Sequence, residues 1–290
     1  MSSNYDFKLL TAQDLPILHQ TFLDAFADYL VPIQLNEAQF KAKLKREGVQ
    51  TELCGGAFYK ENLAGFILTG LGEWQGKYTA YNAGTGVVPQ HRGHALTRRL
   101  YEFMLPAMQK AGVKQCLLEV IKQNVPALKV YQSLGFKITR TLDCFRSFKE
   151  ELILHIPAAK SINIRQATQP NWPLYKSFWD ITPTWQNTPE AITRSTDPKI
   201  ILEAYDEFNQ VTGYVVFYPH NGAIAQLAVS MNARGKGIGT ALLREVARLA
   251  ATPALMLINI DTAGEEFIKY LENRGLRRIL MQYEMVLPIG

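Results

Sequence analysis

The sequence carries one pattern twice, and this repeat limits the folds open to the chain. Residues 87–93 read Val-Val-Pro-Gln-His-Arg-Gly, and residues 229–235 read Val-Ser-Met-Asn-Ala-Arg-Gly, an offset of 142 positions. A second pair is Tyr-Gln-Ser-Leu-Gly-Phe at 131–136 and Leu-Glu-Asn-Arg-Gly-Leu at 271–276, an offset of 140 positions. Two pairs in nearly the same register indicate that one structural unit occurs twice.

The length fits two units of ordinary domain size, since the chain has 290 residues. Hydrophobic residues make up 47% and charged residues 20%, as in folded globular proteins. We predict one domain over residues 1–150 and a second over residues 160–290. No apolar run approaches the length of a membrane span, and the N-terminus lacks a signal-peptide pattern. A cytoplasmic protein that binds no membrane is therefore expected.

The charged residues and cysteines exclude several classes of function. A net charge of +5 favours anionic ligands such as nucleotides. The basic run at residues 41–46 lacks the interleaved aromatic residues of a nucleic-acid surface, so no nucleic-acid partner is expected. Cys54, Cys116 and Cys144 form no C-x-x-C pair. This spacing indicates neither a disulfide framework nor a metal site.

The apolar patterns predict the same order of elements in both halves. For the first half they predict strands at 6–10, 56–59, 63–69, 78–88, 115–121 and 141–148, and helices at 15–29, 37–46, 98–110 and 126–134. For the second half they predict strands at 162–165, 200–205, 211–218, 223–229, 255–260 and 278–287, and helices at 172–179, 240–250 and 265–274. Residues 181–198 are rich in Pro, Thr and Asn, which predicts a loop with little regular structure.

A glycine-rich segment joins a predicted strand to a predicted helix in the second half. It reads Arg-Gly-Lys-Gly-Ile-Gly at residues 234–239. Glycines at alternate positions allow a backbone to approach a ligand closely, and a helix N-terminus offers unpaired N–H groups. The segment therefore predicts a phosphate site. The spacing matches neither the P-loop motif nor Gly-x-Gly-x-x-Gly, which disfavours a kinase or a dehydrogenase.

These paired features resemble the GNAT superfamily of acetyl-CoA-dependent N-acetyltransferases, present here as a tandem over roughly residues 5–148 and 162–287. The family's loop signature, Arg/Gln-x-x-Gly-x-Gly/Ala, matches the segment beginning at Arg234. A later family segment has Asn, then Tyr seven residues on, then Gly-Phe, and it matches Asn124, Tyr131 and residues 135–136. The resemblance implies an α/β (α+β) fold of two GNAT-like domains, each with a mixed, mostly antiparallel central sheet flanked by helices.

The resemblance also implies a chemistry and a set of site residues. In the family an amine attacks the thioester of acetyl-CoA directly, and a tyrosine protonates the departing thiolate. Tyr131 is thus the candidate general acid, Glu119 a candidate acceptor of the amine's proton, and Asn124 a candidate catalytic residue that could equally cap a helix. The candidate residues for binding acetyl-CoA are Val87, Val88, Arg92, Gly93, His94, Ala95, Leu96 and Thr97 in the first half, and Leu227, Val229, Arg234, Gly235, Lys236, Gly237, Ile238, Gly239 and Thr240 in the second.

The two halves depart from the family pattern in complementary places. In the first half, Ala95 and Thr97 stand where the second half has glycine at 237 and 239. In the second half, Leu271 stands where the first half has the tyrosine. Tyr270 is adjacent, but one step along a helix turns a side chain by about 100°, so we expect it to face elsewhere.

We accordingly assign catalysis to the first half, with acetyl-CoA bound along residues 87–97 and Tyr131 as the acid. The second half is then a degenerate copy that binds coenzyme A or shapes the acceptor pocket. Two alternatives are catalysis centred on the second half and a non-catalytic protein that binds or senses coenzyme A. The acceptor is a small-molecule or peptide amine, whose identity depends on loops such as Leu30–Asn36, Gly70–Lys77 and Thr182–Pro198.

Overall fold

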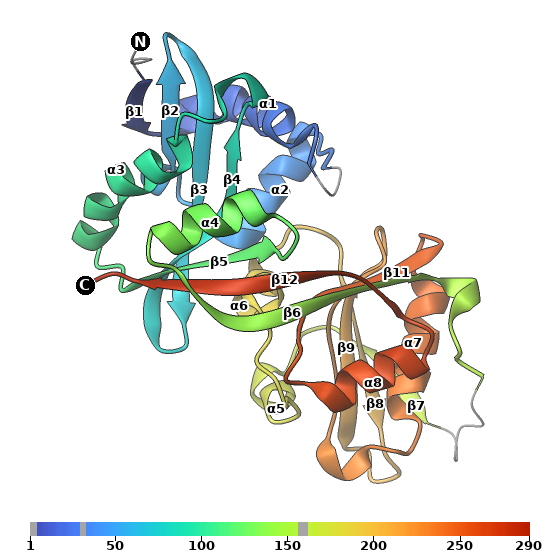
Figure 1. Cartoon of the computed structure of the whole chain (residues 1–290). Coiled ribbons are helices and arrows are strands. Elements are labelled where there is room, and N and C mark those ends of the chain that lie inside the picture. The colour runs from blue at the N-terminus through green and yellow to red at the C-terminus, as the bar shows by residue number, and fades with distance from the viewer. Residues whose placement is uncertain (1–4, 30–32, 156–161) are drawn as a thin grey trace. The chain divides into compact units, whose positions relative to one another are not determined.

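The computed structural model describes residues 5–29, 33–155 and 162–290, which form two compact units (Figure 1). The first unit comprises residues 1–139, 193–196 and 283–290, and the second comprises residues 140–192 and 197–282. Within the described ranges, no helix is both long and apolar enough to cross a membrane.

The first unit is a sheet with strand order β1-β2-β3-β4-β5-β12, in which β12 is Arg277–Pro288, and the described residues of the unit include helices α1 to α4. Strands β1 to β4 pair antiparallel, and β4 pairs parallel with β5. Helix α2 begins at a capping box formed by Asn36 and Gln39 and ends at the left-handed Gly48. The elements are β1 (Tyr5–Leu9), α1 (Leu15–Phe26), α2 (Glu37–Glu47), β2 (Gly55–Tyr59), β3 (Asn62–Trp74), β4 (Lys77–Val87), α3 (Leu96–Lys110), β5 (Gln115–Ile121) and α4 (Val125–Ser133).

The second unit repeats this plan with strand order β6-β11-β10-β9-β8-β7. Its neighbouring strands pair antiparallel except β10 and β11, which pair parallel, so the mixed, mostly antiparallel sheet is confirmed in both units. The elements are β6 (Lys137–Phe148), β7 (Asn163–Ala167), α5 (Trp172–Lys176), α6 (Pro189–Arg194), β8 (Ile200–Tyr205), β9 (Val211–Tyr218), β10 (Ala223–Val229), α7 (Ile238–Leu249), β11 (Ala254–Asp261), α8 (Glu265–Asn273) and β12 (Arg277–Pro288).

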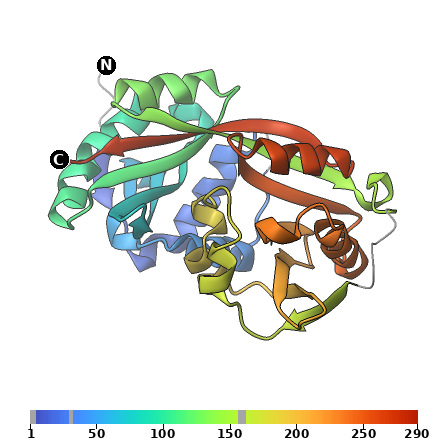
Figure 2. The same ribbon diagram turned by 90° about the horizontal axis from the view of Figure 1, so that it is seen from below.

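The last strand of each repeat completes the sheet of the other unit. The end of β12 neighbours β5, and Met285 of β12 and Ile289, which follows the strand, are buried in the core of the first unit. Figure 2 shows the C-terminus beside α3, where Gln109 donates a hydrogen bond to the carbonyl of Gly290 at 3.1 Å. Conversely, residues 142–148 of β6 pair antiparallel with β11 in the second unit. The two units therefore exchange their terminal strands.

In each unit the hydrogen-bonded pairing of the two parallel strands ends at an equivalent position of the repeat. In the first unit the pairing of β4 with β5 ends at Tyr81, and in the second the pairing of β10 with β11 consists of Ala223 with Met256. Just beyond this point each strand carries one extra residue relative to its antiparallel neighbour, Ala83 in β4 and Ala225 in β10. A bulge of this kind bends a strand and ends regular pairing. Both units therefore contain a divergence between two strands, preceding the glycine loop.

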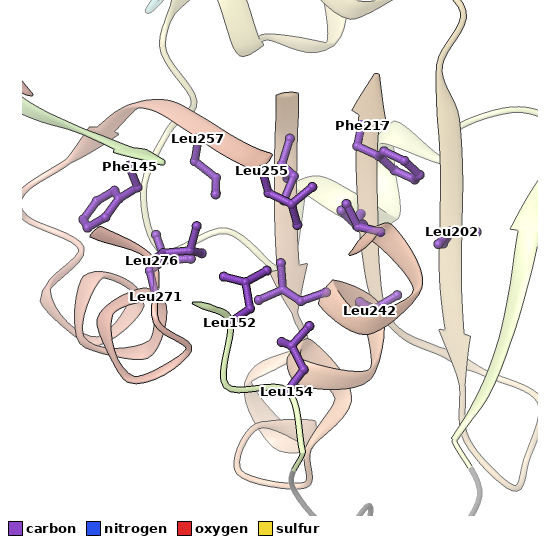
Figure 3. Packing of buried hydrophobic residues seen from close by; sticks show 14 of the residues in the cluster. Phe145, Leu152, Leu154, Leu202, Phe217, Leu242, Leu255, Leu257, Leu271 and Leu276 are labelled. Carbon is purple, nitrogen blue, oxygen red and sulfur yellow. The ribbon is translucent and has the colours of Figure 1, made fainter. Parts of the chain in front are cut away.

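The core of the second unit lies between the sheet and helices α7 and α8 (Figure 3). Leu271 of α8 is wholly buried there, next to Leu276, Phe145 and Leu152. Each such side chain contributes roughly 1.5–3 kcal/mol through burial. The position that aligns with Tyr131 is therefore a packing position in the second unit.

Two sequence-based expectations about local structure were wrong. Residues 181–198 are not without regular structure, because α6 and a short 3-10 helix at Trp185–Asn187 form there. Pro189 starts α6, where its missing N–H costs nothing. Residues 70–77 are not an open loop, because β3 and β4 continue through them as a hairpin that turns at Gln75 and Gly76.

The three cysteines are buried free thiols, and this predicts a pH dependence of stability. Burial raises the pKa of Cys54 and of Cys116 to about 12. A thiol in an unfolded chain titrates near 8.5, so between pH of about 9 and 12 the unfolded chain releases protons that the folded chain retains. The free energy of unfolding should therefore fall as the pH rises through this range. Urea unfolding at pH 8 and pH 10 measures this fall. Rapid thiol labelling of the native protein at pH 8 would contradict it.

Candidate active site

The loop before α7 has the backbone geometry of an anion cradle. Gly235 and Gly237 have φ angles of 74° and 83°, in the left-handed region that glycine adopts without strain. Gly237 is the N-cap residue of α7, and no heavy atom lies within 4 Å of a Cβ built on either glycine. The helix therefore begins beneath open space, as anion binding at a helix N-terminus requires.

The corresponding loop of the first unit has the same backbone with less suitable residues. Gly93 has a φ of 83°, and Ala95, the N-cap residue of α3, has a φ of 55°. A left-handed alanine costs about 1–2 kcal/mol relative to a right-handed one. The loop thus keeps its shape in spite of Ala95, and Thr97 lies in the first turn of the helix that follows.

The signature arginine of the second unit braces the loop. Arg234 donates hydrogen bonds to the carbonyl groups of Val229 at 3.0 Å and Phe178 at 3.2 Å. Its Nη1 atom lies 2.7 Å from Oδ2 of Asp180. These contacts tie the strand end, the loop and the segment after α5 together. The backbone amides are thus the main groups that the loop offers to an anion.

Arg92 makes the same set of contacts in the first unit. It donates hydrogen bonds to the carbonyl groups of Val87 at 3.2 Å and Ala25 at 3.1 Å, and it pairs with both carboxylate oxygens of Asp28. The hydrogen bond from Arg92 lowers the pKa of Asp28. Asp28 is therefore a partner of the loop arginine.

A cavity of about 420 Å³ lies in the second unit. This volume is in the range typical of sites for small ligands. Its wall runs along β10, through the glycine loop into α7, and across to β11 and α8. All of the second-half candidates except Lys236 line it, namely Leu227, Val229, Arg234, Gly235, Gly237, Ile238, Gly239 and Thr240.

This cavity reaches both faces of the sheet of the second unit. On one face its lining includes Ile238 and Tyr270, which belong to the core under α7 and α8. On the other face it includes Phe178 and Tyr214, which belong to the separate cluster around α5. The cavity passes from one face of the sheet to the other where β10 and β11 diverge beyond Ala223. Two ligands could therefore meet in this cavity from opposite sides.

Tyr270 lines the cavity, which corrects the expectation that it faces elsewhere. Its hydroxyl oxygen would lie 2.9 Å from a Cβ placed on Gly239, so the ring covers the first turn of α7 closely. A threonine at this position, such as Thr97 in the first unit, would collide with it. The repeat offset aligns Tyr270 with Val130. The first unit therefore has the larger Thr97 and the smaller Val130 at the two positions where the second unit has Gly239 and the larger Tyr270.

A small pocket of the first unit, between the sheet and α3, is filled by its own side chains. The pocket lined by Ala80, Asn82, Tyr101 and Cys116, where β4 and β5 part, leaves no volume that a water molecule could enter. Asn82 donates a hydrogen bond to the hydroxyl of Tyr101 at 2.8 Å, and the Tyr101 ring is 1% exposed. These side chains therefore close this small pocket.

Tyr131 lies beside this closed region. Its ring is buried and packs edge-to-face against Tyr101 and Phe136, with centroid distances of 6.3 and 5.6 Å. Burial raises the pKa of Tyr131, while hydrogen bonds with Thr85 and Asn82 of β4 oppose that rise. The hydroxyl thus faces the strand that diverges from β5, although aromatic packing surrounds the ring.

The remaining first-half candidates make local contacts. The Asn124 side chain accepts a hydrogen bond from the amide of Ala127 at 3.2 Å and caps α4. Glu119 accepts one from the hydroxyl of Tyr81 at 2.6 Å. The His94 ring packs against Tyr5 at 5.6 Å.

Sequence reasoning missed much of the cavity wall on the α5 side. Trp179, Tyr214, Gln226 and Asn259 all line the cavity. Of the sequence-based expectations, only the role of the loop at residues 182–198 in acceptor choice indicated this side of the cavity. Thr182, Pro183 and Asn187 from that segment do line the cavity. From the loop at 30–36, residues 30–32 lie outside the described part of the structure.

Comparison with known proteins identifies the family. The family model for the acetyltransferase (GNAT) family matches residues 16–136 and again residues 163–276. The chain therefore belongs to the GNAT acetyltransferases and carries two copies of the domain. Among curated proteins, it is similar to an N-alpha-acetyltransferase, MAK3, of Arabidopsis thaliana, with 31% identity over 85 residues. That match covers 29% of this chain and 45% of the relative, so the chain spans less than half of the relative's length.

Solved structures share the fold over nearly the whole chain. A tandem GNAT protein from the clavulanic acid biosynthesis pathway aligns over 99% of both chains, with a TM-score of 0.74 and 14% identity. A GCN5-related N-acetyltransferase from Sphaerobacter thermophilus aligns over 98% of this chain and 96% of its own, with a TM-score of 0.72 and 16% identity. A glucosamine N-acetyltransferase region of a fungal multi-domain β-N-acetylglucosaminidase aligns over 99% of this chain and 38% of its own, with a TM-score of 0.76 and 13% identity. At these identities the likeness concerns the fold alone.

Proposed function

We propose that this protein is an acetyl-CoA-dependent N-acetyltransferase whose chemistry is centred in the second unit. One observation carries the proposal: a single cavity joins the glycine loop to the opposite face of the sheet. This favours the alternative that the sequence left open over the assignment of catalysis to the first half.

The residues of the second unit fit acetyl-CoA. Open space above Gly235 and Gly237 leaves room for a pyrophosphate on the amides of the α7 N-terminus. Leu227 and Val229 of β10 pair with β9 and lie beyond Ala223, the residue at which β10 pairs with β11, so this stretch of β10 can bind the pantetheine arm. Acetyl-CoA supplies a thioester whose carbonyl carbon is open to attack by an amine. The apolar wall around Phe178 and Tyr214 would exclude water from that carbonyl.

The proposal is tested by titrating the protein with acetyl-CoA in a calorimeter and by measuring thiol release with a panel of amines. We expect micromolar binding and thiol release that depends on an amine. The buried cysteines keep the background of the thiol assay low. Binding without turnover across the panel would instead favour a protein that senses coenzyme A.

The first unit is a second candidate for catalysis, because the Tyr131 hydroxyl faces β4 where that strand leaves β5. A general acid contributes roughly 10²–10⁴-fold to a rate. If the chemistry is in the second unit, Tyr131→Phe should change kcat by less than about twofold. A loss of tenfold or more, with a changed pH profile and an unchanged Tm, would return the acid role to Tyr131.

A further inference from the structure

We infer that the acceptor is a small monoamine whose amino group is carried on a flat aromatic or apolar body. This inference rests on the proposed function and concerns the part of the cavity on the α5 face of the sheet. An amine that reaches a thioester held along β10 from the face opposite α7 has to enter past this wall. The chemistry of the wall therefore selects the acceptor.

Aromatic rings and apolar groups dominate this wall. Phe178, Trp179 and Tyr214 line it, and Ile181 and Pro183 border it. Tyr214 is held in a fixed orientation, because Tyr175 stacks on it with centroids 3.9 Å apart and an interplanar angle of 7°. Rigid aromatic side chains suit a flat body that can stack against them.

Three polar side chains of the wall, those of Trp179, Tyr214 and Gln226, already form a chain of hydrogen bonds. Trp179 donates its indole hydrogen to the hydroxyl of Tyr214 at 2.6 Å, and that hydroxyl donates to Oε1 of Gln226 at 2.7 Å. Gln226 in turn donates to the backbone carbonyl of Asn187 at 2.6 Å. An acceptor with many hydroxyl groups would lose its hydrogen bonds to water without gaining replacements here. The chain of hydrogen bonds thus disfavours an amino sugar.

The charges of the cavity also favour a single ammonium group. Among the described residues, the carboxylates that line it are Asp180 and Glu266. Asp180 is paired with Arg234 at 2.7 Å, whereas Glu266 lies exposed in the first turn of α8. Glu203 lies behind the wall and accepts hydrogen bonds from Tyr175 and Tyr205, both at 2.6 Å. A polyamine would bring more positive charge than these groups can compensate.

The test compares tryptamine and phenethylamine with spermidine, kanamycin and a short peptide that has a free N-terminus. Calorimetric binding in the presence of coenzyme A and thiol release from acetyl-CoA are both measured. We expect the two aromatic monoamines to bind most tightly and to give the highest kcat/KM. For Trp179→Ala we expect an approximately tenfold weaker affinity for tryptamine, because a stacking partner is lost.

Trp172→Ala is the matched control, since Trp172 packs edge-to-face on Tyr175 and is not part of the cavity lining. We expect it to leave tryptamine binding unchanged. Thermal unfolding of both variants separates a loss of binding from a loss of folding, and Trp179→Phe, which keeps a ring, should recover most of the affinity. Tightest binding of spermidine, kanamycin or the peptide would overturn the acceptor inference while leaving the N-acetyltransferase proposal intact. Absence of thiol release with every amine would overturn that proposal, and calorimetric selectivity would still decide the acceptor class.

Discussion

Replacing Gly237 with glutamate is expected to weaken acetyl-CoA binding at least 100-fold and to remove turnover. Gly237 has a φ of 83° and is the N-cap residue of α7, so a carboxylate there would lie at the point that we propose for the pyrophosphate. Two like charges 4 Å apart repel by about 4 kcal/mol at an effective dielectric constant of 20. The fold should survive, because a Cβ at this position meets no heavy atom within 4 Å. The remaining cost is about 1–2 kcal/mol for a left-handed non-glycine residue.

The matched control is Ala95→Glu, because Ala95 is the N-cap residue of α3 and also has a left-handed backbone. It introduces the same charge at the equivalent point of the first unit. We expect less than a threefold change in the Kd for acetyl-CoA. Gly237→Ala separates backbone strain from charge. If Ala95→Glu removed binding and Gly237→Glu did not, acetyl-CoA would be bound in the first unit, as the sequence suggested.

Features that depend on local backbone geometry could be predicted from the sequence. The repeat, the order of elements and the helix that follows each loop are present, since glycine spacing and apolar periodicity act within a few residues. The left-handed turns at Gly93 and Gly235 follow from the same local rule. The repeat offset even places the bulges at Ala83 and Ala225 in register.

The unit that contains the large cavity could not be predicted, because pairs of residues distant in the sequence decide it. Thr97 is compatible with a small neighbour such as Val130, whereas Gly239 leaves room for the ring of Tyr270. Likewise, Asn82 of β4 donates a hydrogen bond to the hydroxyl of Tyr101 of α3 and helps to fill a small pocket of the first unit. A loop motif alone indicates whether an anion cradle can form. It does not indicate whether the cavity beside the cradle is open.

Tyr270 illustrates a limit of arguing from helical periodicity. Leu271 is indeed in the core, and Tyr270 is indeed one step around the helix from it. Tyr270 nevertheless lines the cavity, because the cavity lies beside the core, between α8 and the start of α7, and not on the continuation of the core face. A side chain turned by 100° from the core can therefore still reach the cavity.

The exchange of terminal strands has no local signature, and it leads to a second large predicted effect. Met285→Asp, a change in the last residues of the chain, should lower the free energy of unfolding of the first unit by about 3–5 kcal/mol. Met285 is fully buried in the core of that unit, together with Tyr101 and Leu118. Hydrogen exchange read by mass spectrometry should show faster exchange over residues 5–139 and little change over residues 197–282.

Two further variants make this prediction specific to strand exchange. Ile279→Asp introduces the same charge on the same strand at a side chain that is 51% exposed, and it should leave exchange in both regions nearly unchanged. Phe145→Asp lies in the first repeat of the sequence, but its ring is fully buried in the second unit's core beside Leu271, so it should destabilise residues 197–282 instead. If Met285→Asp accelerated exchange only within residues 197–282, the C-terminal strand would belong to the core of its own repeat. In that case neither unit would depend on the other for its last strand, and each half expressed alone should fold.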